Sequence, residues 1–211
     1  MLAGSGSRTK RTEILEIDGT IHIPAGLQSD PRFIMPDEVV ADRVREYQLA
    51  APGLRGIDPM CGVGTIPRVI AAMGGICDAI ELDIYQYTVA KAELPTEAVI
   101  IYGDCLLVQP TTTYDYIYTS MPFAWFEHSN GPDAAFAQVF RRMLKPGGIL
   151  ILDSDDIARR NGRTWPLAEL QIAFFTAHGF RCNEAKRFIA KNPHAKQDST
   201  FTELTFTLDT I

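Results

Sequence analysis

The stretch Leu54–Thr65 constrains this chain most, because it reads as a short buried strand that turns into a glycine loop and then a helix. Its sequence, LRGIDPMCGVGT, has an apolar run closed by Asp58 and Pro59, followed by Gly62 and Gly64. Strand, turn and helix in this order are typical of parallel α/β sheets, and glycines let the backbone approach a ligand closely. We therefore expect a sheet built around this strand, with a pocket at its end.

Segments of strand and helix character alternate along the rest of the chain. The expected strands span 54–58, 76–81, 99–102, 114–119, 148–152, 180–189 and 201–208. The expected helices begin at 37 and span 65–73, 85–94, 134–144 and 167–177, and residues 145–148 read as a turn. This alternation predicts an α/β fold with a mostly parallel sheet and helices on both faces. No helical pattern separates the last two strands, so we expect them to be antiparallel.

The N-terminal residues are predicted to be peripheral. Residues 1–12 are small, polar and basic, which indicates a flexible leader, and residues 13–32 include ILEIDGTIHI. Asp18 and Gly19 in that stretch are the turn signal of a hairpin, so we expect a small β-appendage there. The core is expected to span 33–211, and 211 residues suit one domain better than two.

Composition excludes some classes of protein. No run of about 18 apolar residues occurs, so no membrane span is predicted. The chain has four cysteines without zinc-type spacing, which predicts neither a metal site nor a disulfide framework and fits a reducing cytoplasm: Cys61, Cys77, Cys105 and Cys182.

Charge is unevenly distributed around a net charge of −6. Residues 1–140 hold 9 Lys or Arg against 18 Asp or Glu, whereas residues 141–196 hold 11 against 5. A nucleic acid would therefore meet the basic C-terminal third. The residues expected to contact phosphate, or alternatively to form only a solvated face, are Arg159, Arg160, Arg163, Lys186, Arg187, Lys191 and Lys196.

Carboxylates stand at three successive predicted strand ends, at Asp58, Glu81 and Asp104. They could be solvated turn residues, but three in register favour a ligand site, since such sheets bind ligands at the carboxyl ends of their strands. A carboxylate at the second strand end suits a ribose diol, and Asp58 could face an amino group of the ligand. Pro67 stands where a dinucleotide fingerprint has its third glycine, which argues against a hydride-transfer cofactor.

IDPMCGVGT resembles the cofactor loop of S-adenosylmethionine-dependent methyltransferases, in the Asp-Pro-Phe-Cys-Gly-Ser-Gly-Thr form of DNA and RNA amino-methyltransferases. Met60 and Val63 depart from that form conservatively. FIMPDEVVADRV, AIELDIYQYTVAKA, YGDCL and LKPGGILIL extend the resemblance over roughly 33–208. It implies a Rossmann-like class I fold with a seven-stranded sheet and an antiparallel C-terminal strand, S-adenosyl-L-methionine as cofactor and no metal. The cofactor-binding residues it implies are Met35, Pro36, Asp58, Pro59, Cys61, Gly62, Gly64, Thr65, Glu81 (ribose), Leu82, Asp104 (adenine amino group) and Cys105.

The segment Ser120-Met121-Pro122-Phe123, at the end of the fourth predicted strand, is similar to the catalytic motif of the same amino-methyltransferases, with Met121 in place of the first proline. By this resemblance the Ser120 hydroxyl and the Met121 carbonyl would accept the two N–H groups of an exocyclic amine. Pro122 would stiffen the turn and Phe123 would stack on a flipped base. The alternative is an apolar loop that caps the sheet.

The resemblance therefore implies an N-methyltransferase acting on a nucleobase, in DNA at N4 of cytosine or N6 of adenine. An RNA guanine-N2 enzyme, a small-amine methyltransferase and a cofactor-binding protein without catalysis remain alternatives.

Overall fold

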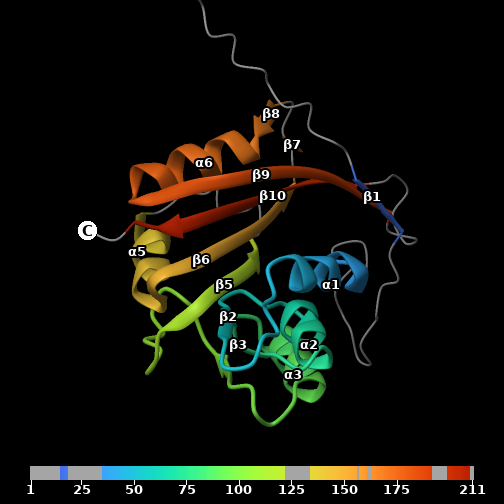
Figure 1. Cartoon of the computed structure of the whole chain (residues 1–211), viewed down its shortest axis with the longest axis vertical. Coiled ribbons are helices and arrows are strands. Elements are labelled where there is room, and N and C mark those ends of the chain that lie inside the picture. The colour runs from blue at the N-terminus through green and yellow to red at the C-terminus, as the bar shows by residue number, and fades with distance from the viewer. Residues whose placement is uncertain are drawn as a thin grey trace, which may run out of the picture.

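The computed structural model describes residues 15–18, 35–121, 134–155, 157–160, 163–191 and 199–209. Its core is an eight-stranded sheet in the order β1-β9-β10-β6-β5-β2-β3-β4, with helices on both faces (Figure 1). The strands are β1 Leu15–Asp18, β2 Arg55–Asp58, β3 Ile76–Glu81, β4 Ile100–Tyr102, β5 Tyr114–Ser120, β6 Leu144–Asp155, β9 Phe180–Lys191 and β10 Ser199–Leu208. All seven predicted strands are present, and β10 runs antiparallel to β6 and β9 as expected.

The helices are α1 Asp37–Glu46, α2 Thr65–Ala72, α3 Ile84–Glu93, α5 Ala134–Met143 and α6 Leu167–Ala177. Each predicted helix is confirmed within a few residues. In the part of the chain that the structure describes, no helix is long and apolar enough to span a bilayer.

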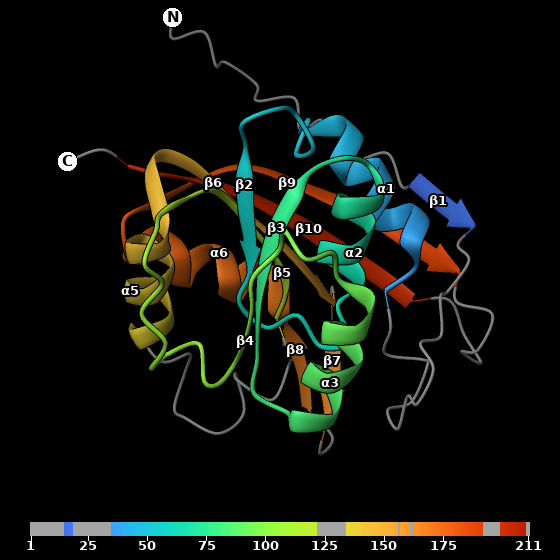
Figure 2. The same ribbon diagram turned by 90° about the horizontal axis from the view of Figure 1, so that it is seen from below.

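Helices cover both faces of the sheet (Figure 2), and two hydrophobic layers hold them to it. On one face, α5 places Phe136, Val139, Phe140 and Met143 one or two turns apart, so that one apolar stripe packs on β5, β6 and α6. Phe140 stacks on Phe175 of α6 with the ring centroids 5.9 Å apart. On the other face, buried side chains of α1 and α2 pack against β5 and β6. The sheet is thus covered on both faces, as the alternating pattern predicted.

Three segments show pairing that the sequence did not predict. The segment expected in a separate appendage contains β1, which pairs in parallel with β9 and so forms an edge of the main sheet; the predicted return strand lies outside the described residues. Residues 145–148 belong to β6 rather than to a turn, because the register shift between β5 and β6 absorbs them and Gly147 takes a φ of 76°. The stretch after β6, where no strand was expected, contains an antiparallel pair, β7 Ile157–Arg160 and β8 Arg163–Pro166.

The order in which the chain adds strands to the sheet reverses between β2 and β5, although these two strands are parallel. The chain runs from β2 outward through β3 to β4, and then returns to the other side of β2 as β5, with Ile57 paired to Ile117. At such a switch point the neighbouring connections leave in opposite directions and open a crevice at the carboxyl ends of the strands. Asp58 ends β2 and Ser120 ends β5, so both lie at this crevice.

Candidate active site

The glycine loop between β2 and α2 has a conformation that requires glycine. Gly62 and Gly64 have φ values of 56° and 85°. A Cβ on Gly64 would lie 3.0 Å from the Cβ of Ala90 in α3, so a side chain would press on the neighbouring helix as well as strain the backbone. The loop is fastened to β3 by the Cys61 amide, which donates to the Ile80 carbonyl at 3.0 Å. The loop before α2 is therefore fixed against α3 and β3 at the carboxyl end of β2.

Glu81 connects this loop to the end of β3. One of its carboxylate oxygens accepts a hydrogen bond from the Gly62 amide at 2.7 Å, and the other accepts from the Asp83 amide at 2.7 Å. The side chain is buried, with 8% of its surface exposed. Each oxygen keeps a further lone pair, so the fixed carboxylate can still accept hydroxyl protons of a ribose.

Asp58 lies at the end of β2, almost completely buried. Its Oδ1 accepts from the Met60 amide at 3.1 Å. Burial raises the pKa of Asp58 to about 7, aided by the nearby charges of Glu81 and Asp153 and opposed by hydrogen bonding from Thr119 and Met60. A carboxylate desolvated to this degree would gain a great deal from an amino group placed beside it.

The end of β4 supplies the next wall. The Gly103 amide donates to the Glu81 carbonyl at 2.9 Å, which brings this strand end beside that of β3. Asp104 has an oxygen that accepts from the Leu106 amide at 2.9 Å. Leu82 and Leu107 are 64% and 79% exposed, which is unusual for leucine. A flat apolar ring such as adenine could cover them.

The remaining predicted cofactor residues lie in or beside the same loop, or on the segment before α1. Pro59, Cys61, Thr65 and Cys105 are buried, and burial raises the pKa of the Cys61 and Cys105 thiols, so these two residues support the loop by packing. The Met35 sulfur lies 3.9 Å from the Tyr118 hydroxyl oxygen, and Pro36 is the N-cap of α1. All four cysteines are free, and the described residues contain no group of side chains arranged to hold a metal.

Ser120 and Met121 point in opposite directions from the end of β5. Ser120 is exposed, whereas Met121 is 6% exposed and belongs to the core that α5 and α6 cover. The buried Met121 side chain therefore holds the end of β5 in place. In the motif that the segment resembles, a proline at this position would instead restrict the backbone. Pro122 and Phe123 lie outside the described residues.

A buried charged network under α1 was not anticipated from the sequence. Arg43 of α1 forms ion pairs with Glu203 of β10 and, at 3.0 Å, with Glu46. Asp153 of β6 accepts a hydrogen bond from the Tyr118 hydroxyl at 2.6 Å. One sequence feature could have pointed to this network: Asp153 directly follows an apolar run of strand character, just as Asp58 does.

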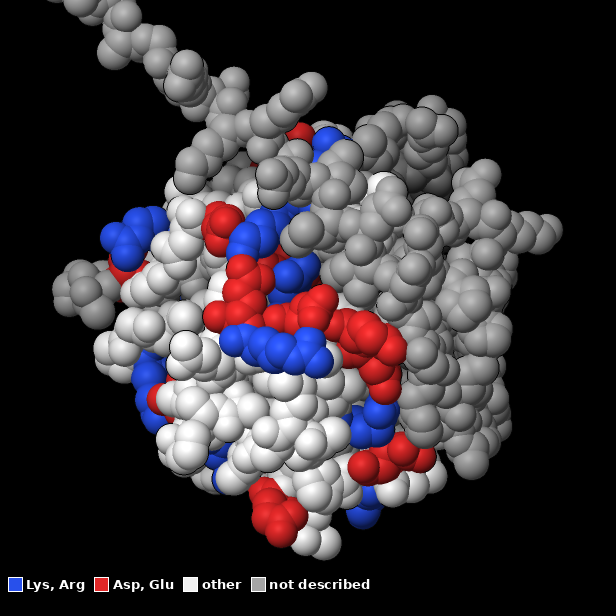
Figure 3. Space-filling view, turned by 45° about the vertical axis from the view of Figure 1, so that its right-hand side comes forward, with Lys and Arg blue, Asp and Glu red and all other residues white. Residues whose placement is uncertain are grey.

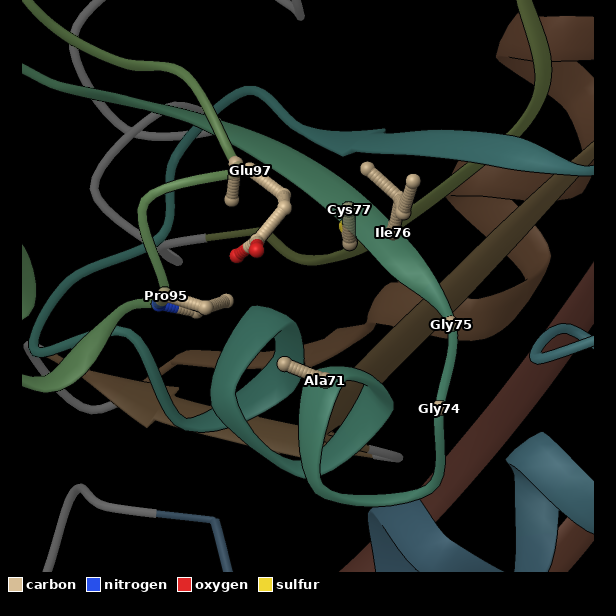
Figure 4. Close-up of a pocket in the computed structure, with 8 residues that line it drawn as sticks. Ala71, Gly74, Gly75, Ile76, Cys77, Pro95 and Glu97 are labelled. Atoms are coloured by element: carbon tan, nitrogen blue, oxygen red, sulfur yellow. The ribbon is translucent and has the colours of Figure 1, made fainter.

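The pocket drawn in Figure 4 is separate from this site. It has a volume of about 310 Å³ and lies where α2 ends and β3 begins, at the opposite end of β3 from Glu81. Its walls include Ala71, Gly75, Ile76, Cys77, Pro95 and Glu97.

These features fit S-adenosylmethionine. The glycine loop has the positive φ angles and the close packing on α3 that only glycine allows, Glu81 offers carboxylate oxygens for a ribose, and the exposed leucines offer an apolar surface for a base. Asp58 and Glu81 both influence the thiols of Cys61 and Cys105, so the predicted residues of the first two strand ends and the loop are gathered at one place.

Comparison with known proteins agrees with this geometry. Residues 57–152 match the methyltransferase domain family. No curated protein matches the sequence. Among solved structures, a candidate RNA methyltransferase from Pyrococcus horikoshii is 14% identical, with a TM-score of 0.64 and 87% of each chain covered. A TehB-like methyltransferase from Corynebacterium glutamicum is 20% identical, with a TM-score of 0.58 and coverage of 81% of this chain and 88% of that one.

A third similar structure, the glycopeptide N-methyltransferase MtfA, contains S-adenosyl-L-methionine. It is 13% identical, with a TM-score of 0.57, and the alignment covers 78% of this chain and 86% of that one. The domain match over the cofactor half of the chain and the geometry of that half together define a methyltransferase that depends on S-adenosylmethionine. S-adenosylmethionine is its cofactor.

Proposed function

We propose that this enzyme methylates an exocyclic amino group of a nucleobase, with DNA as the first substrate and N4 of cytosine or N6 of adenine as the acceptor. One observation carries the proposal. Ser120 is an exposed hydroxyl at the switch point, at the end of the strand that pairs directly with the strand of the cofactor loop. A group in that position can hold an acceptor nitrogen beside a methyl donor bound over Gly62 and Gly64.

The acceptor chemistry explains why a hydroxyl is useful there. S-adenosylmethionine, when bound, supplies an electrophilic methyl group on a sulfonium. The lone pair of an exocyclic amine is delocalised into the base, so acceptors for its N–H groups orient the nitrogen and make it more nucleophilic. Ser120 Oγ and the Met121 carbonyl can serve as these acceptors. An amine held by these two acceptors would take the methyl group from the sulfonium, which would leave as a neutral thioether, and the amine would lose one N–H proton to water.

Fewer basic residues are proposed to contact nucleic acid than the sequence suggested. Lys186 forms ion pairs with Glu46 and Glu184 and is therefore not free for phosphate, and Lys145 pairs with Asp115 at 2.7 Å. Viewed from the side of α1, acidic and basic side chains are intermingled (Figure 3). The β7–β8 pair instead carries Arg159, Arg160 and Arg163 on the chain that leaves the carboxyl end of β6, beside the acceptor end. We propose this hairpin as the phosphate-binding element, which predicts salt-dependent binding.

RNA is the second candidate substrate. The similar Pyrococcus horikoshii protein is described as a candidate RNA methyltransferase, which favours testing guanine N2 in RNA. The name of MtfA likewise favours including amines outside nucleic acids. The four free cysteines fit a cytoplasmic location, which we propose for the enzyme.

The test is an incubation with methyl-labelled cofactor and separate DNA, RNA and small-amine panels, followed by digestion of the nucleic acids to nucleosides. We expect label in N4-methylcytosine or N6-methyladenine from DNA. Ser120→Ala should lower the rate at least 10-fold, since one acceptor contact is lost. Thr113→Ala, which removes an exposed hydroxyl before the other end of β5, is the matched control and should leave the rate unchanged.

Each outcome assigns a substrate class. Label confined to RNA or to amines would reject the DNA proposal while keeping an N-methyltransferase. Cofactor binding by calorimetry without turnover on any panel would indicate a protein that has lost catalysis.

A further inference from the structure

A serine that holds an amine by accepting its N–H must direct its own hydroxyl proton elsewhere. The hydroxyl has one proton and two lone pairs, and a proton aimed at the amine would oppose the contact. Ser120 therefore needs a nearby acceptor of its own. Among the described residues, the structure gives its hydroxyl no hydrogen-bond partner.

The register of the sheet places a carboxylate beside it. Ser120 of β5 is directly paired with Asp153 of β6, and the strands are parallel. Paired residues of neighbouring strands lie about 4.8 Å apart and project from the same face of the sheet. Tyr118, two residues before Ser120, projects from that face and reaches Asp153, which confirms the direction of both side chains.

Of the two carboxylate oxygens of Asp153, one accepts a hydrogen bond from the described residues and the other does not. Oδ2 accepts from the Tyr118 hydroxyl, whereas Oδ1 has no hydrogen-bond partner in the described part of the chain. The residue is completely buried. A buried acceptor without a donor costs free energy, so Oδ1 would gain from any hydroxyl within reach.

Arg43 balances the charge of this carboxylate. Burial raises the pKa of Asp153, and the Tyr118 hydroxyl and the positive charge of Arg43 both act in the opposite direction. Glu203 of β10 lies beside Asp153 in the next strand and shares Arg43 with it. The charged and titratable groups that face Asp153 from the packed elements are thus Tyr118 from β5, Arg43 from α1, Glu203 from β10 and Asp58 from β2.

We propose that Asp153 is a positioning residue of the acceptor site: its Oδ1 accepts the hydroxyl proton of Ser120, which leaves the lone pairs of Ser120 free for the N–H of the acceptor amine. Tyr118 fixes which oxygen faces the serine. The role of the amine rests on the proposed function, whereas the contact between the two side chains can be tested without any substrate.

Asp153→Asn tests the polarity of the contact. In this variant the amide oxygen accepts from Tyr118, so the amide nitrogen faces Ser120 and donates to it, and the serine proton then points at the amine. We expect kcat to fall 10- to 100-fold, the range of one charge-assisted hydrogen bond, with cofactor affinity unchanged. Adding Tyr118→Phe frees the amide to turn its oxygen towards Ser120, so the double variant should recover most of kcat. A further loss in the double variant would overturn the proposal, because a purely structural role predicts that the two losses accumulate.

A substrate-free readout separates this proposal from the proposed function. The pKa of Asp153, followed by carbon-13 NMR of labelled aspartate carboxyls, should rise in Ser120→Ala, since the ionised carboxylate loses a donor. Thr113→Ala is the control and should leave this pKa unchanged. An unchanged pKa in Ser120→Ala would overturn the contact even in an active enzyme. A raised pKa in an enzyme inactive on every panel would support the contact and reject the proposed substrate.

Discussion

Asp58→Asn should make the protein more stable at alkaline pH while weakening its site. The carboxyl group is 1% exposed, and its folded-state pKa of about 7 lies well above its ordinary value of 3.8. Between these two values the unfolded chain releases a proton that the folded chain retains. Stability is therefore highest at low pH and is lost as the pH rises from about 4 to about 7.

The size of this loss follows from the interval between the two pKa values. The two pKa values differ by about three units, and each unit corresponds to about 1.4 kcal/mol, so the free energy of unfolding falls by up to roughly 4 kcal/mol by pH 8. This value is an upper bound for the gain in Asp58→Asn, because hydrogen-bond partners also change on substitution. Asparagine keeps an oxygen for the Met60 amide but does not ionise. The variant should match the wild type near pH 4 and exceed it above pH 7.

Urea unfolding at several pH values between 4 and 8.5 measures this difference. Asp42→Asn, at a partly exposed position, is the matched control and should change stability by less than about 0.5 kcal/mol at every pH. Calorimetry should show weaker binding of S-adenosylmethionine by Asp58→Asn, because the neutral amide attracts an amino group less. Stability curves for wild type and Asp58→Asn that run parallel across this range would refute the reasoning.

Three further substitutions test other parts of the structure. Gly64→Ala should lower the thermal midpoint by more than Gly53→Ala, since both sites have positive φ but only the first would press a Cβ on α3; equal losses in thermal unfolding would contradict this. Glu81→Gln should destabilise the loop by about 1–3 kcal/mol and weaken cofactor binding in calorimetry, because one of two backbone amides then faces an NH₂ group; unchanged affinity would contradict the assignment. Arg43→Met should cost about 3–5 kcal/mol in urea unfolding by leaving buried carboxylates uncompensated, whereas Arg45→Met on the exposed face should cost almost nothing, and similar values for the two would refute the buried network.

Local patterns were sufficient for most of the fold. The apolar runs bounded by glycine, proline and acidic residues correspond to β2, β3 and β5, because strands of a parallel sheet are buried on both faces and need continuous apolar sequence. The helices were found from apolar spacing for the same reason. The prediction failed where long-range pairing decided the outcome, as in β1, which depends on β9 about 170 residues away.

The sequence also predicted where three carboxylates lie. Because the order of strands brings consecutive strand ends together, the pattern of strands alone places Asp58, Glu81 and Asp104 at one edge of the sheet. The sequence did not predict that Glu81 holds the amide of Gly62 or that Asp58 is desolvated. Both facts depend on side-chain direction and on neighbours from other strands.

The sequence by itself determined the glycine loop, the alternation of strands and helices and the position of Ser120 at a strand end, because these follow from backbone preferences and short-range periodicity. Only the tertiary structure decided what surrounds that serine. Asp153 and Arg43 are far from it in the chain, and they meet beside it because β6 pairs with β5 in one register and α1 covers that face. A shift of one residue in that register would turn Asp153 to the other face of the sheet and remove it from the acceptor site.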